Sequence, residues 1–571
     1  LSMTYDIVIR GGTIVDGSGA PRYQADIAIE GDRIASIGRI PEKGTEEVDA
    51  RGLIVSPGFI DGHTHFDAQI SWDPYGTSSC YHGVTSVIMG NCGFTLAPCH
   101  PDDQDILMRT LEAVEDIPAA AQRVGVDWTW QTFPEFMQFL QDKPKGINYG
   151  GYVGHTALRT YVMRDRAFTD PASDEEIGQM AEILNEGVLA GGMGLSTTRS
   201  PAHKTREGAP VPSRLASWDE VRTLVMALSE INRGVVEISG EPTMGQDPDD
   251  PNHYERRFRD LAIESGRPMF FPALHSRRAE PGTWKRFFDR AQEAAGEGGR
   301  MFGQAHSREL CTNWSWQTEM PFDRLSMWRD IRKLPLDEQM TLLQDPDVVE
   351  QLVHIANHEE EDFSRVMPAQ ARKPSDWDWV FILDHVDGTP NRRLGEVARE
   401  REEDPVKTMI DVGVEQALDT LYMVPLANEN QDTVLEIMRE PRSLVTFSDG
   451  GAHVSQIMDS SLQTHVLSHW VRNSGEVTLE QGVKYLTWDM ATAWELPDRG
   501  LLRRGYKADM ILFDLDTVGP EHPTVEHDLP AGQRRLVQKA RGYHMSIVNG
   551  GITMRDGEPT GVTTGQVLTS V

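Results

Sequence analysis

The sequence predicts an α/β protein: a (β/α)8 barrel of the TIM type, a small β-sandwich domain and an insertion over the barrel mouth. Two observations lead to this prediction. Eight short apolar runs are each followed by a polar or glycine-rich turn and a helical pattern, which is the alternation expected of a parallel barrel. Short alternating runs broken by glycine also occur at both ends of the chain, as in β-hairpins.

The two chain ends are expected to pair in one β-sandwich domain, made of residues 1–57 and 500–571. Tyr5 to Arg10 alternates between apolar and polar residues and ends in two glycines, and Tyr543 to Val548 near the other end has the same character. Residues 58–499 then remain for the barrel.

The eight apolar runs give the candidate barrel strands. They are Leu53–Ile60, Val84–Met89, Asn148–Val153, Met193–Thr197, Gly234–Ile238, Met269–Leu274, Met301–Ala305 and Leu444–Phe447. Barrel enzymes place their chemistry at the carboxyl ends of the strands, so functional residues are sought just after each run.

The interval before the last strand is too long for a barrel loop, and about 310–440 is predicted to be an inserted lid segment. Residues 394–400 and 405–410 have amphipathic helical patterns, and 377–383 has the pattern of a strand. Such a lid could exclude water and shape an acyl pocket. Its aromatic residues equally fit a core of its own.

Composition narrows the class of protein. The chain has 571 residues, 39% of them hydrophobic and 25% charged, which describes a soluble globular protein with an ample core. A net charge of -33 argues against a nucleic-acid or anionic-membrane partner. No apolar run approaches the ~20 residues that cross a bilayer. Four cysteines and no basic, apolar leader indicate a reduced, cytoplasmic setting, compatible with a homo-oligomer.

Two histidines follow the first strand, in Pro57-Gly58-Phe59-Ile60-Asp61-Gly62-His63-Thr64-His65-Phe66-Asp67. Side chains alternate across a strand, so His63 and His65 lie on one face and can share a metal ion such as Zn²⁺. A histidine pair alone is common by chance. The flanking Pro-Gly-Phe-Ile-Asp-Gly, together with Asp67, resembles the first barrel strand of the amidohydrolase superfamily, metal-dependent hydrolases built on a (β/α)8 barrel.

Within that superfamily the chain resembles the N-acyl-D-amino acid deacylase (D-aminoacylase) branch. After the second strand comes Gly90-Asn91-Cys92-Gly93, and the resemblance implies that Cys92 ligates metal in place of the carboxylated lysine of other members. No lysine closes the fourth strand, which agrees with this replacement. The alternative is a buried packing cysteine. One or two Zn²⁺ or other divalent ions are implied.

Two further ligand positions depart from this branch. Glu237 stands where the deacylases carry a histidine, and a carboxylate can also bind zinc. His275, after the sixth strand, lies two residues beyond the aligned ligand, a shift of about 6.6 Å at ~3.3 Å per residue. Both are candidate ligands, and His306 after the seventh strand is a secondary candidate.

Ser448-Asp449-Gly450 follows the last strand and matches the superfamily's last-strand aspartate. Barrel closure would bring Asp449 beside His63, as a metal ligand and as the catalytic residue. Asp449 would take a proton from a metal-activated water, orient its attack on a carbonyl carbon and deliver the proton to the leaving amine.

Four residues are candidates for substrate contact: His155 after the third strand, Arg199 and His203 after the fourth, and His453 after the last. His155 equally fits a role in holding a loop. The segment with Arg199 and His203 equally fits a surface turn.

The expected reaction is hydrolysis of a small linear amide, an N-acyl amine or N-acyl amino acid. The deacylases recognise a carboxylate partly through an arginine after the last strand, in a His-Pro-Arg and Phe-Pro-Arg context. This chain reads His453-Val454-Ser455-Gln456 and Leu462-Gln463-Thr464-His465 instead, so an amide without a free carboxylate becomes competitive. Two alternatives stay open: a hydrolase of a lactone, ester or cyclic imide, and a non-catalytic binding protein that has kept the barrel.

Overall fold

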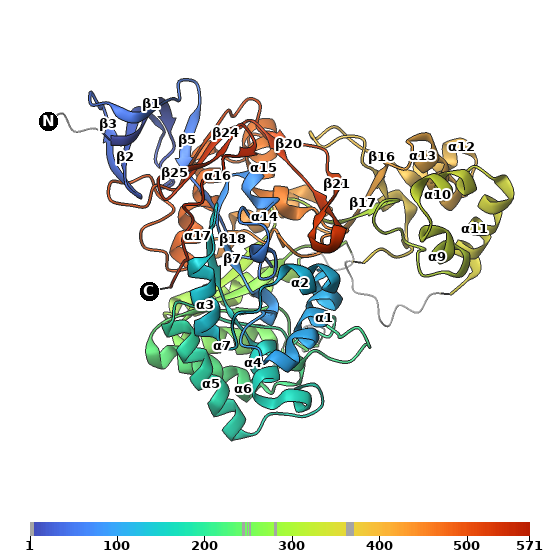
Figure 1. Cartoon of the computed structure of the whole chain (residues 1–571), viewed down its shortest axis with the longest axis horizontal. Coiled ribbons are helices and arrows are strands. Elements are labelled where there is room, and N and C mark those ends of the chain that lie inside the picture. Colours follow the sequence, from blue (N-terminus) through green and yellow to red (C-terminus); the bar gives the residue numbers. More distant parts are fainter. Residues whose placement is uncertain are drawn as a thin grey trace.

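The computed structural model describes residues 5–242, 246–247, 249–250, 253–278, 282–360 and 370–570 (Figure 1). Its centre is the predicted barrel. In chain order the strands are β6 (Phe59–Asp61), β7 (Val84–Met89), β8 (Asn148–Gly151) continued by β9 (Val153–Gly154), β10 (Gly194–Thr197), β11 (Val235–Ile238), β12 (Pro268–Leu274), β13 (Arg300–Ala305) and β18 (Ser443–Val445). Each pairs in parallel with its neighbour.

The barrel closes where its first and last strands end. The backbone N–H of His65 donates to the carbonyl of Gly450 at 2.7 Å, and Thr64 pairs with Gly450 in parallel. This closure places the residues that follow β6 beside those that follow β18.

Helices surround the strands on the outside. They are α1 (Gln104–Glu115), α2 (Ala119–Gly125), α3 (Phe133–Asp142), α4 (His155–Met163), α5 (Asp174–Leu189), α6 (Trp218–Ile231), α7 (Tyr254–Ser265), α8 (Thr283–Gly296), α14 (Gln431–Arg439), α15 (Leu462–His465), α16 (Leu479–Leu486) and α17 (Trp488–Ala493). Ser173 caps α5 by accepting from the Glu176 N–H at 3.3 Å, while the Glu176 side chain returns to the cap, a reciprocal pair that the sequence encodes. No helix among the described residues combines the length and apolarity of a bilayer span.

Both chain ends contribute to one nine-stranded sheet, where blue and red strands lie side by side in Figure 1. Its members are β1 (Tyr5–Ile14), β2 (Tyr23–Glu30), β3 (Arg33–Gly38), β4 (Gly44–Asp49), β5 (Ile54–Pro57), β19 (Met510–Phe513), β24 (Tyr543–Val548), β25 (Gly551–Arg555) and β26 (Glu558–Pro559). The join is β5, which pairs with β1 on one side and antiparallel with β19 on the other. Two antiparallel pairs accompany it: β21 (Thr524–Leu529) with β22 (Gln533–Val537), and β20 (Gly519–Pro520) with β23 (Ala540–Arg541), which flank them in the chain.

The predicted first barrel strand is two strands in the structure. Residues 54–57 belong to the terminal sheet and 59–61 to the barrel, with Gly58 between them. A Cβ atom at Gly58 would lie 2.1 Å from Oγ1 of Thr85, so only glycine lets the chain pass this close to β7 as it changes sheets.

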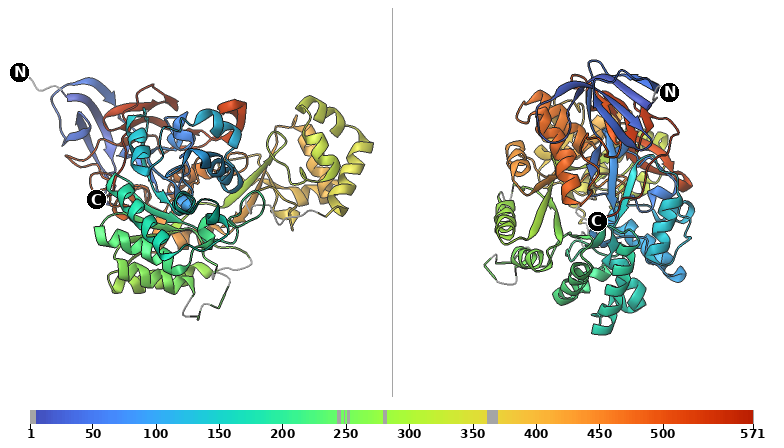
Figure 2. Two further views of the ribbon diagram at one scale, coloured as in Figure 1. Left: turned by 60° about the horizontal axis from the view of Figure 1, so that its bottom comes forward. Right: turned by 90° about the vertical axis from the view of Figure 1, so that its left-hand side faces the viewer.

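The insertion forms its own lobe, which projects to one side in two views (Figures 1 and 2). It comprises β14 (Leu310–Ser315), α9 (Ser326–Arg332), α10 (Leu336–Leu343), α11 (Pro346–His358), β15 (Phe381–Ile382), β16 (Arg392–Arg393), α12 (Leu394–Arg401), α13 (Pro405–Glu415) and β17 (Leu421–Ala427). Trp316, Trp328 and Tyr422 are buried in a separate apolar core, so these aromatic residues serve the lobe itself. The lobe meets the barrel through β14, whose Asn313 N–H donates to the Gln456 carbonyl at 2.5 Å.

A buried charge pair joins the terminal sheet to the barrel. Asp509 and Arg499 are each 6% exposed and form an ion pair. Asp509 also accepts from the Asn148 side chain at 3.0 Å and from the Asn549 N–H at 2.7 Å. Asn148 begins the third barrel strand, so this carboxylate connects the two parts of the fold.

We expect Asp509→Ala to lower the free energy of unfolding by about 3–5 kcal/mol, because it leaves the buried Arg499 guanidinium without its partner. The urea unfolding midpoint measures the change. Asp516→Ala removes an exposed carboxylate from the same segment and is expected to stay within about 0.5 kcal/mol of the parent protein. Equal midpoints for the two variants would contradict the structural role of Asp509.

Candidate metal centre

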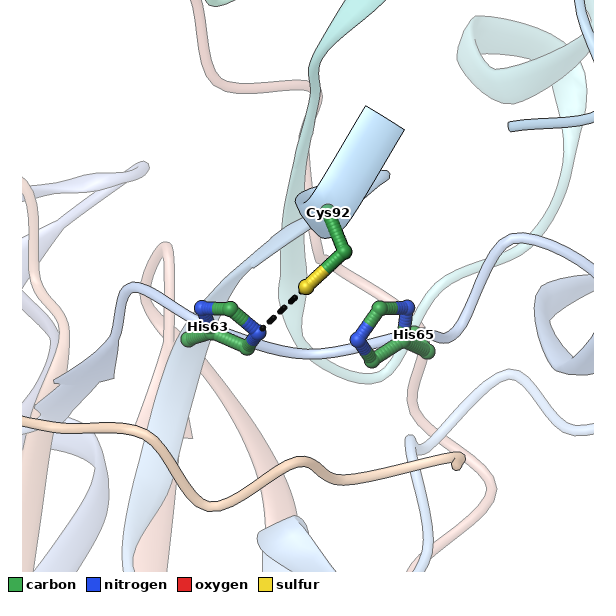
Figure 3. Close-up of side chains that lie close together, drawn as sticks. All are labelled: His63, His65 and Cys92. Carbon is green, nitrogen blue, oxygen red and sulfur yellow. Dashed lines mark hydrogen bonds between the residues drawn. The ribbon is translucent and has the colours of Figure 1, made fainter. Parts of the chain in front are cut away.

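Three side chains converge where β6 and β7 end (Figure 3). Nε2 of His63 lies 3.6 Å from Sγ of Cys92, and one ligand atom each of His63, His65 and Cys92 falls within 4.8 Å of the others. Asp449 adds an oxygen from the other side of the barrel seam. Its Oδ1 lies 3.2 Å from Nε2 of His65 and 3.7 Å from Nε2 of His63.

The Gly90-Asn91-Cys92-Gly93 turn holds the thiol in place. Gly90 has φ 79°, and a Cβ there would lie 2.7 Å from the Thr95 side chain. Asn91 donates from its amide to the Thr64 carbonyl at 3.1 Å and to the Ile88 carbonyl at 2.9 Å. The asparagine thereby ties the end of the second strand to the histidine segment.

Three residues of the cluster have left-handed backbone conformations. The φ angles are 57° for Cys92, 55° for Asp449 and 47° for His453. Such conformations cost roughly 1 kcal/mol or more for a residue with a Cβ, and they concentrate at functional sites because surrounding structure enforces them. The surrounding structure holds these three backbones in strained conformations, which set the directions of their side chains.

The pKa values of the His63 and His65 imidazoles are shifted in opposite directions. Burial lowers the pKa of His63 to about 3, so this ring is neutral at pH 7. Burial acts in the same direction on His65, but the charges of Glu115 and Asp449 outweigh it and raise the pKa of His65 to about 9. For Asp449, burial alone would raise the pKa, yet the interactions with His65, His453 and His63 hold the pKa of that carboxyl well below its usual range.

The donor set fits a divalent metal ion. Both ring nitrogens of His65 are buried, and neither makes a hydrogen bond of good geometry among the described residues. A thiolate, two imidazoles and a carboxylate are the ligands that zinc takes in proteins. The four residues are therefore arranged as ligands of one centre would be, and their role as ligands remains our prediction.

Sequence reasoning missed Glu115, the last residue of α1. Its Oε2 lies 3.7 Å from Nε2 of His65 and 3.5 Å from Nε2 of His453. The helix carries Leu107, Leu111 and Val114 on its buried face, and Glu115 continues that face. A carboxylate at an apolar position of an amphipathic helix was the available signal.

Comparison with known proteins decides the family. The sequence model described as "Amidohydrolase family" matches residues 46–554, most of the chain. The chain belongs to the amidohydrolase family. It is 28% identical to a D-aminoacylase of Alcaligenes xylosoxydans xylosoxydans, covering 99% of this chain and 98% of that protein. An N-acyl-D-aspartate deacylase of the same organism is 27% identical over 99% of this chain and 95% of the relative.

The fold has the same relatives. A solved structure of D-aminoacylase, studied for the role of its binuclear metal centre, matches this amidohydrolase with a TM-score of 0.66 and 23% identity, over 99% of this chain and 100% of that chain. The similarity to this solved structure supports the predicted fold, a barrel with an accessory domain.

Two predicted ligands lie differently in this amidohydrolase. Oε2 of Glu237 accepts from the Cys92 N–H at 2.9 Å, and burial raises the pKa of Glu237 to about 8. Its other oxygen, Oε1, is buried without a hydrogen-bond partner. His275 is half-buried at the end of β12 and belongs to neither of the two ligand groups found among the described residues, and nor does His306. Glu237 thus contacts the backbone of Cys92. The residues described after the sixth strand contribute to neither ligand group.

The four predicted substrate residues divide into two pairs. Both nitrogens of His155 are engaged, with Thr197 at 2.8 Å and Glu220 at 2.9 Å, which favours the loop-holding role that the sequence left open. Arg199 forms an ion pair with Glu241 at 3.1 Å, so a carboxylate of the protein itself balances the arginine charge.

The other two residues face the cluster. Burial lowers the pKa of His203 to about 3, and the charges of His453 and His65 act in the same direction. Nε2 of His453 lies 3.6 Å from Oδ2 of Asp449. His203 and His453 therefore remain our candidates for substrate contact.

Gln304 near the end of β13 is a second residue that sequence reasoning missed. Its Oε1 accepts from Nδ1 of His63 at 2.9 Å, which fixes the tautomer and leaves Nε2 available toward Cys92. Partners of this kind orient metal-binding histidines and raise their basicity.

We expect Gln304→Met to weaken metal affinity by about 10–100-fold. We also expect it to cost about 1–3 kcal/mol of stability, because the buried Nδ1–H of His63 loses its acceptor. The amide nitrogen of Gln304 is buried without a hydrogen-bond partner, so an apolar side chain of similar length suits the position. Competition against a chelator of known affinity measures the change. Gln122→Met removes another buried amide and serves as the control; unchanged affinity in Gln304→Met would contradict the orienting role.

Proposed function

We propose that this amidohydrolase is a metal-dependent enzyme that hydrolyses a linear amide, an N-acyl amino acid or N-acyl amine, with Asp449 as the proton shuttle. One observation carries the proposal. Residues from the first, second and last barrel strands bring sulfur, nitrogen and oxygen donors to one buried point at the carboxyl ends of the strands.

The chain's own residues define how the metal would be held. His63 and Cys92 face each other, and His65 and Asp449 stand beside them. A divalent ion such as Zn²⁺, when bound here, supplies a water molecule of lowered pKa and polarises the scissile carbonyl.

Asp449 is suited to moving the proton. Its lowered pKa means that it is a carboxylate at neutral pH, able to accept a proton from the attacking water. Its side chain is 11% exposed, whereas the imidazoles of His63 and His65 are almost fully buried. The carboxylate is thus the part of the cluster that can reach both the water and the leaving nitrogen, to which it returns the proton.

The substrate class rests on the relatives. Proteins similar over nearly their whole length are named D-aminoacylase and N-acyl-D-aspartate deacylase, which cleave the bond that joins an acyl group to an amino acid nitrogen. The arginine expected after the last strand is absent, and Arg199 is paired with Glu241. We therefore include acyl amines without a carboxylate among the candidate substrates.

The cysteines and the net charge support a cytoplasmic enzyme that acts on a small molecule. All four cysteines are buried thiols outside any disulfide, as is usual in a reducing compartment, and the net charge of -33 disfavours nucleic acid as a partner.

A substrate panel on the zinc-loaded protein tests the proposal. It contains N-acetyl-D-amino acids, their L-enantiomers, N-acyl amines without a carboxylate, a lactone and a cyclic imide. We expect kcat/KM to be highest for a linear amide. Turnover of the lactone or cyclic imide alone would replace the proposed reaction with the second candidate, ring-opening hydrolysis.

A further inference from the structure

Three separate parts of the fold hold the loop after β18, just beyond the catalytic aspartate. The N–H of His453 donates to the carbonyl of Glu115, at the end of α1, at 2.5 Å. The carbonyl of the next residue accepts from the Leu536 N–H of β22 at 2.7 Å. The Gln456 carbonyl accepts from the Asn313 N–H of β14 at 2.5 Å. A barrel helix, the β21–β22 pair and the inserted lobe therefore all meet on the loop that carries His453.

The side chain of Gln456 is bound to the lobe at both ends of its amide. Gln456 is 2% exposed, and its Nε2 donates to the carboxylate of Glu319. Its Oε1 accepts from Oγ1 of Thr312 at 3.3 Å. Thr312 lies in β14, and Glu319 follows that strand in the chain. The lobe thus holds both the backbone and the side chain of Gln456.

Glu319 keeps its place although the local charges disfavour a carboxylate there. Burial and the charges of Asp116 and Asp323 raise the pKa of Glu319 to about 7, while Arg324 and Arg534 act in the opposite direction. Hydrogen bonds to an ionised group are stronger than bonds between neutral groups. The bond that Glu319 accepts from Gln456 is therefore well suited to fix the loop to the lobe.

The backbone at His453 depends on such anchoring. Its φ is 47°, a left-handed conformation that a residue with a Cβ adopts only where the surroundings enforce it. The N–H of Gln456 donates to the His453 carbonyl at 3.0 Å, so a fixed Gln456 also fixes the turn that begins at His453. In this turn, Nε2 of His453 lies 3.6 Å from Oδ2 of Asp449.

We propose, resting on the function proposed above, that Glu319 is a positioning residue for hydrolysis. Through Gln456 it holds the turn at His453 to the lobe and keeps the His453 ring beside the Asp449 carboxylate. The lobe, which has its own core, then contributes to the active site through this link. Catalytic groups need this precision, because small misplacements of reacting groups greatly slow a reaction.

Glu319→Leu removes the acceptor and keeps a side chain of similar size. At equal zinc content we expect kcat to fall by about 10–100-fold, since a misplacement of about 1 Å can cost about 10²-fold in rate. Glu319→Gln keeps an oxygen that accepts from Gln456 and is expected to retain most of the activity. Gln317→Leu is the matched control, because the Gln317 amide lies in the same segment but donates to Asp419, within the lobe, at 2.7 Å.

A double-mutant cycle separates positioning from a general loss of structure. In a His453→Ala background, Glu319→Leu should lower kcat no further, because the residue through which Glu319 acts is gone. Equal losses in both backgrounds would overturn the proposal. So would parent activity in Glu319→Leu, an equal loss in Glu319→Gln, or an equal loss in Gln317→Leu.

Crystal structures of the parent protein and Glu319→Leu test the same link without turnover. We expect the separation between Nε2 of His453 and Oδ2 of Asp449 to increase by about 1 Å or more in the variant. An unchanged separation would overturn the positioning role. Gln456→Met breaks the same bond from the other side and takes the place of Glu319→Leu if that variant does not fold. A parent protein that hydrolyses no linear amide would contradict the proposed function, and the crystal structures would still decide the link.

Discussion

Replacing Asp449 by asparagine is expected to lower kcat by about 10²–10⁴-fold, the range over which a positioned acid–base group contributes to catalysis. The asparagine side chain has the same shape but cannot accept the proton of the attacking water. KM is expected to change little, because the lost interaction belongs to the transition state more than to substrate binding. Steady-state kinetics with the preferred linear amide measure both constants.

Metal content must be measured on the same Asp449→Asn sample, because the Asp449 oxygen also lies 3.2 Å from His65. Kinetics are therefore compared after both proteins are loaded to equal zinc content. Asp116→Asn supplies the control for loss of a partly buried carboxylate near the site, and its kcat should stay close to the parent value. Undiminished hydrolysis by zinc-loaded Asp449→Asn would refute the shuttle role.

The sequence could predict the part of the site that follows barrel strands. His63, His65, Cys92 and Asp449 each stand in a short motif directly after a β pattern, and the closure of a parallel barrel is general enough to bring such ends together. Barrel closure accounts for their convergence, whereas the resemblance to the deacylase branch and its superfamily indicated the roles of Cys92 and Asp449.

Glu115 and Gln304 could not be placed in the same way. Glu115 reaches the cluster because the end of α1 packs against the loop after β18, which is a contact between segments more than 300 residues apart. Gln304 is selected by its distance from Nδ1 of His63, and a lone glutamine in a strand carries no motif. Tertiary packing decides both positions, and local pattern does not report it.

The boundaries of the fold show a similar limit. The apolar run from Leu53 to Ile60 is continuous in sequence, yet it belongs to two sheets because Gly58 passes close to Thr85. The placement of the insertion over the barrel mouth stays a prediction, because periodicity identifies helices without saying which neighbour they face. The insertion has a separate core that includes Trp316 and Trp328, a contact set that periodicity does not reveal.

Removing the metal is expected to have the largest effect on activity. Without a bound ion, water keeps its pKa of 15.7 in place of about 7, so the hydroxide nucleophile disappears at neutral pH. We expect exhaustive chelation to lower kcat/KM by about 10³-fold or more, and stoichiometric Zn²⁺ or Co²⁺ to restore it. Activity and metal content are followed in the same dialysis series.

Stability should fall together with activity, because the ion binds only the folded site. A metal present at 100 times its dissociation constant contributes about 2.7 kcal/mol to folding, and chelation removes that contribution. The metal-free protein also retains Glu115 and Asp449 as buried carboxylates around His65. A lower thermal midpoint after chelation, reversed by zinc, would report the centre independently of turnover.

Cys92→Ser and His63→Ala provide the internal comparison for chelation. Both remove a predicted ligand of the metal centre, so chelation should change their activity and thermal midpoint far less than those of the parent protein. Full hydrolysis by metal-free parent protein would place the chemistry outside this cluster. A parent protein that neither binds metal nor turns over any member of the panel would favour the binding-protein alternative, since the barrel would then have kept its shape without its reaction.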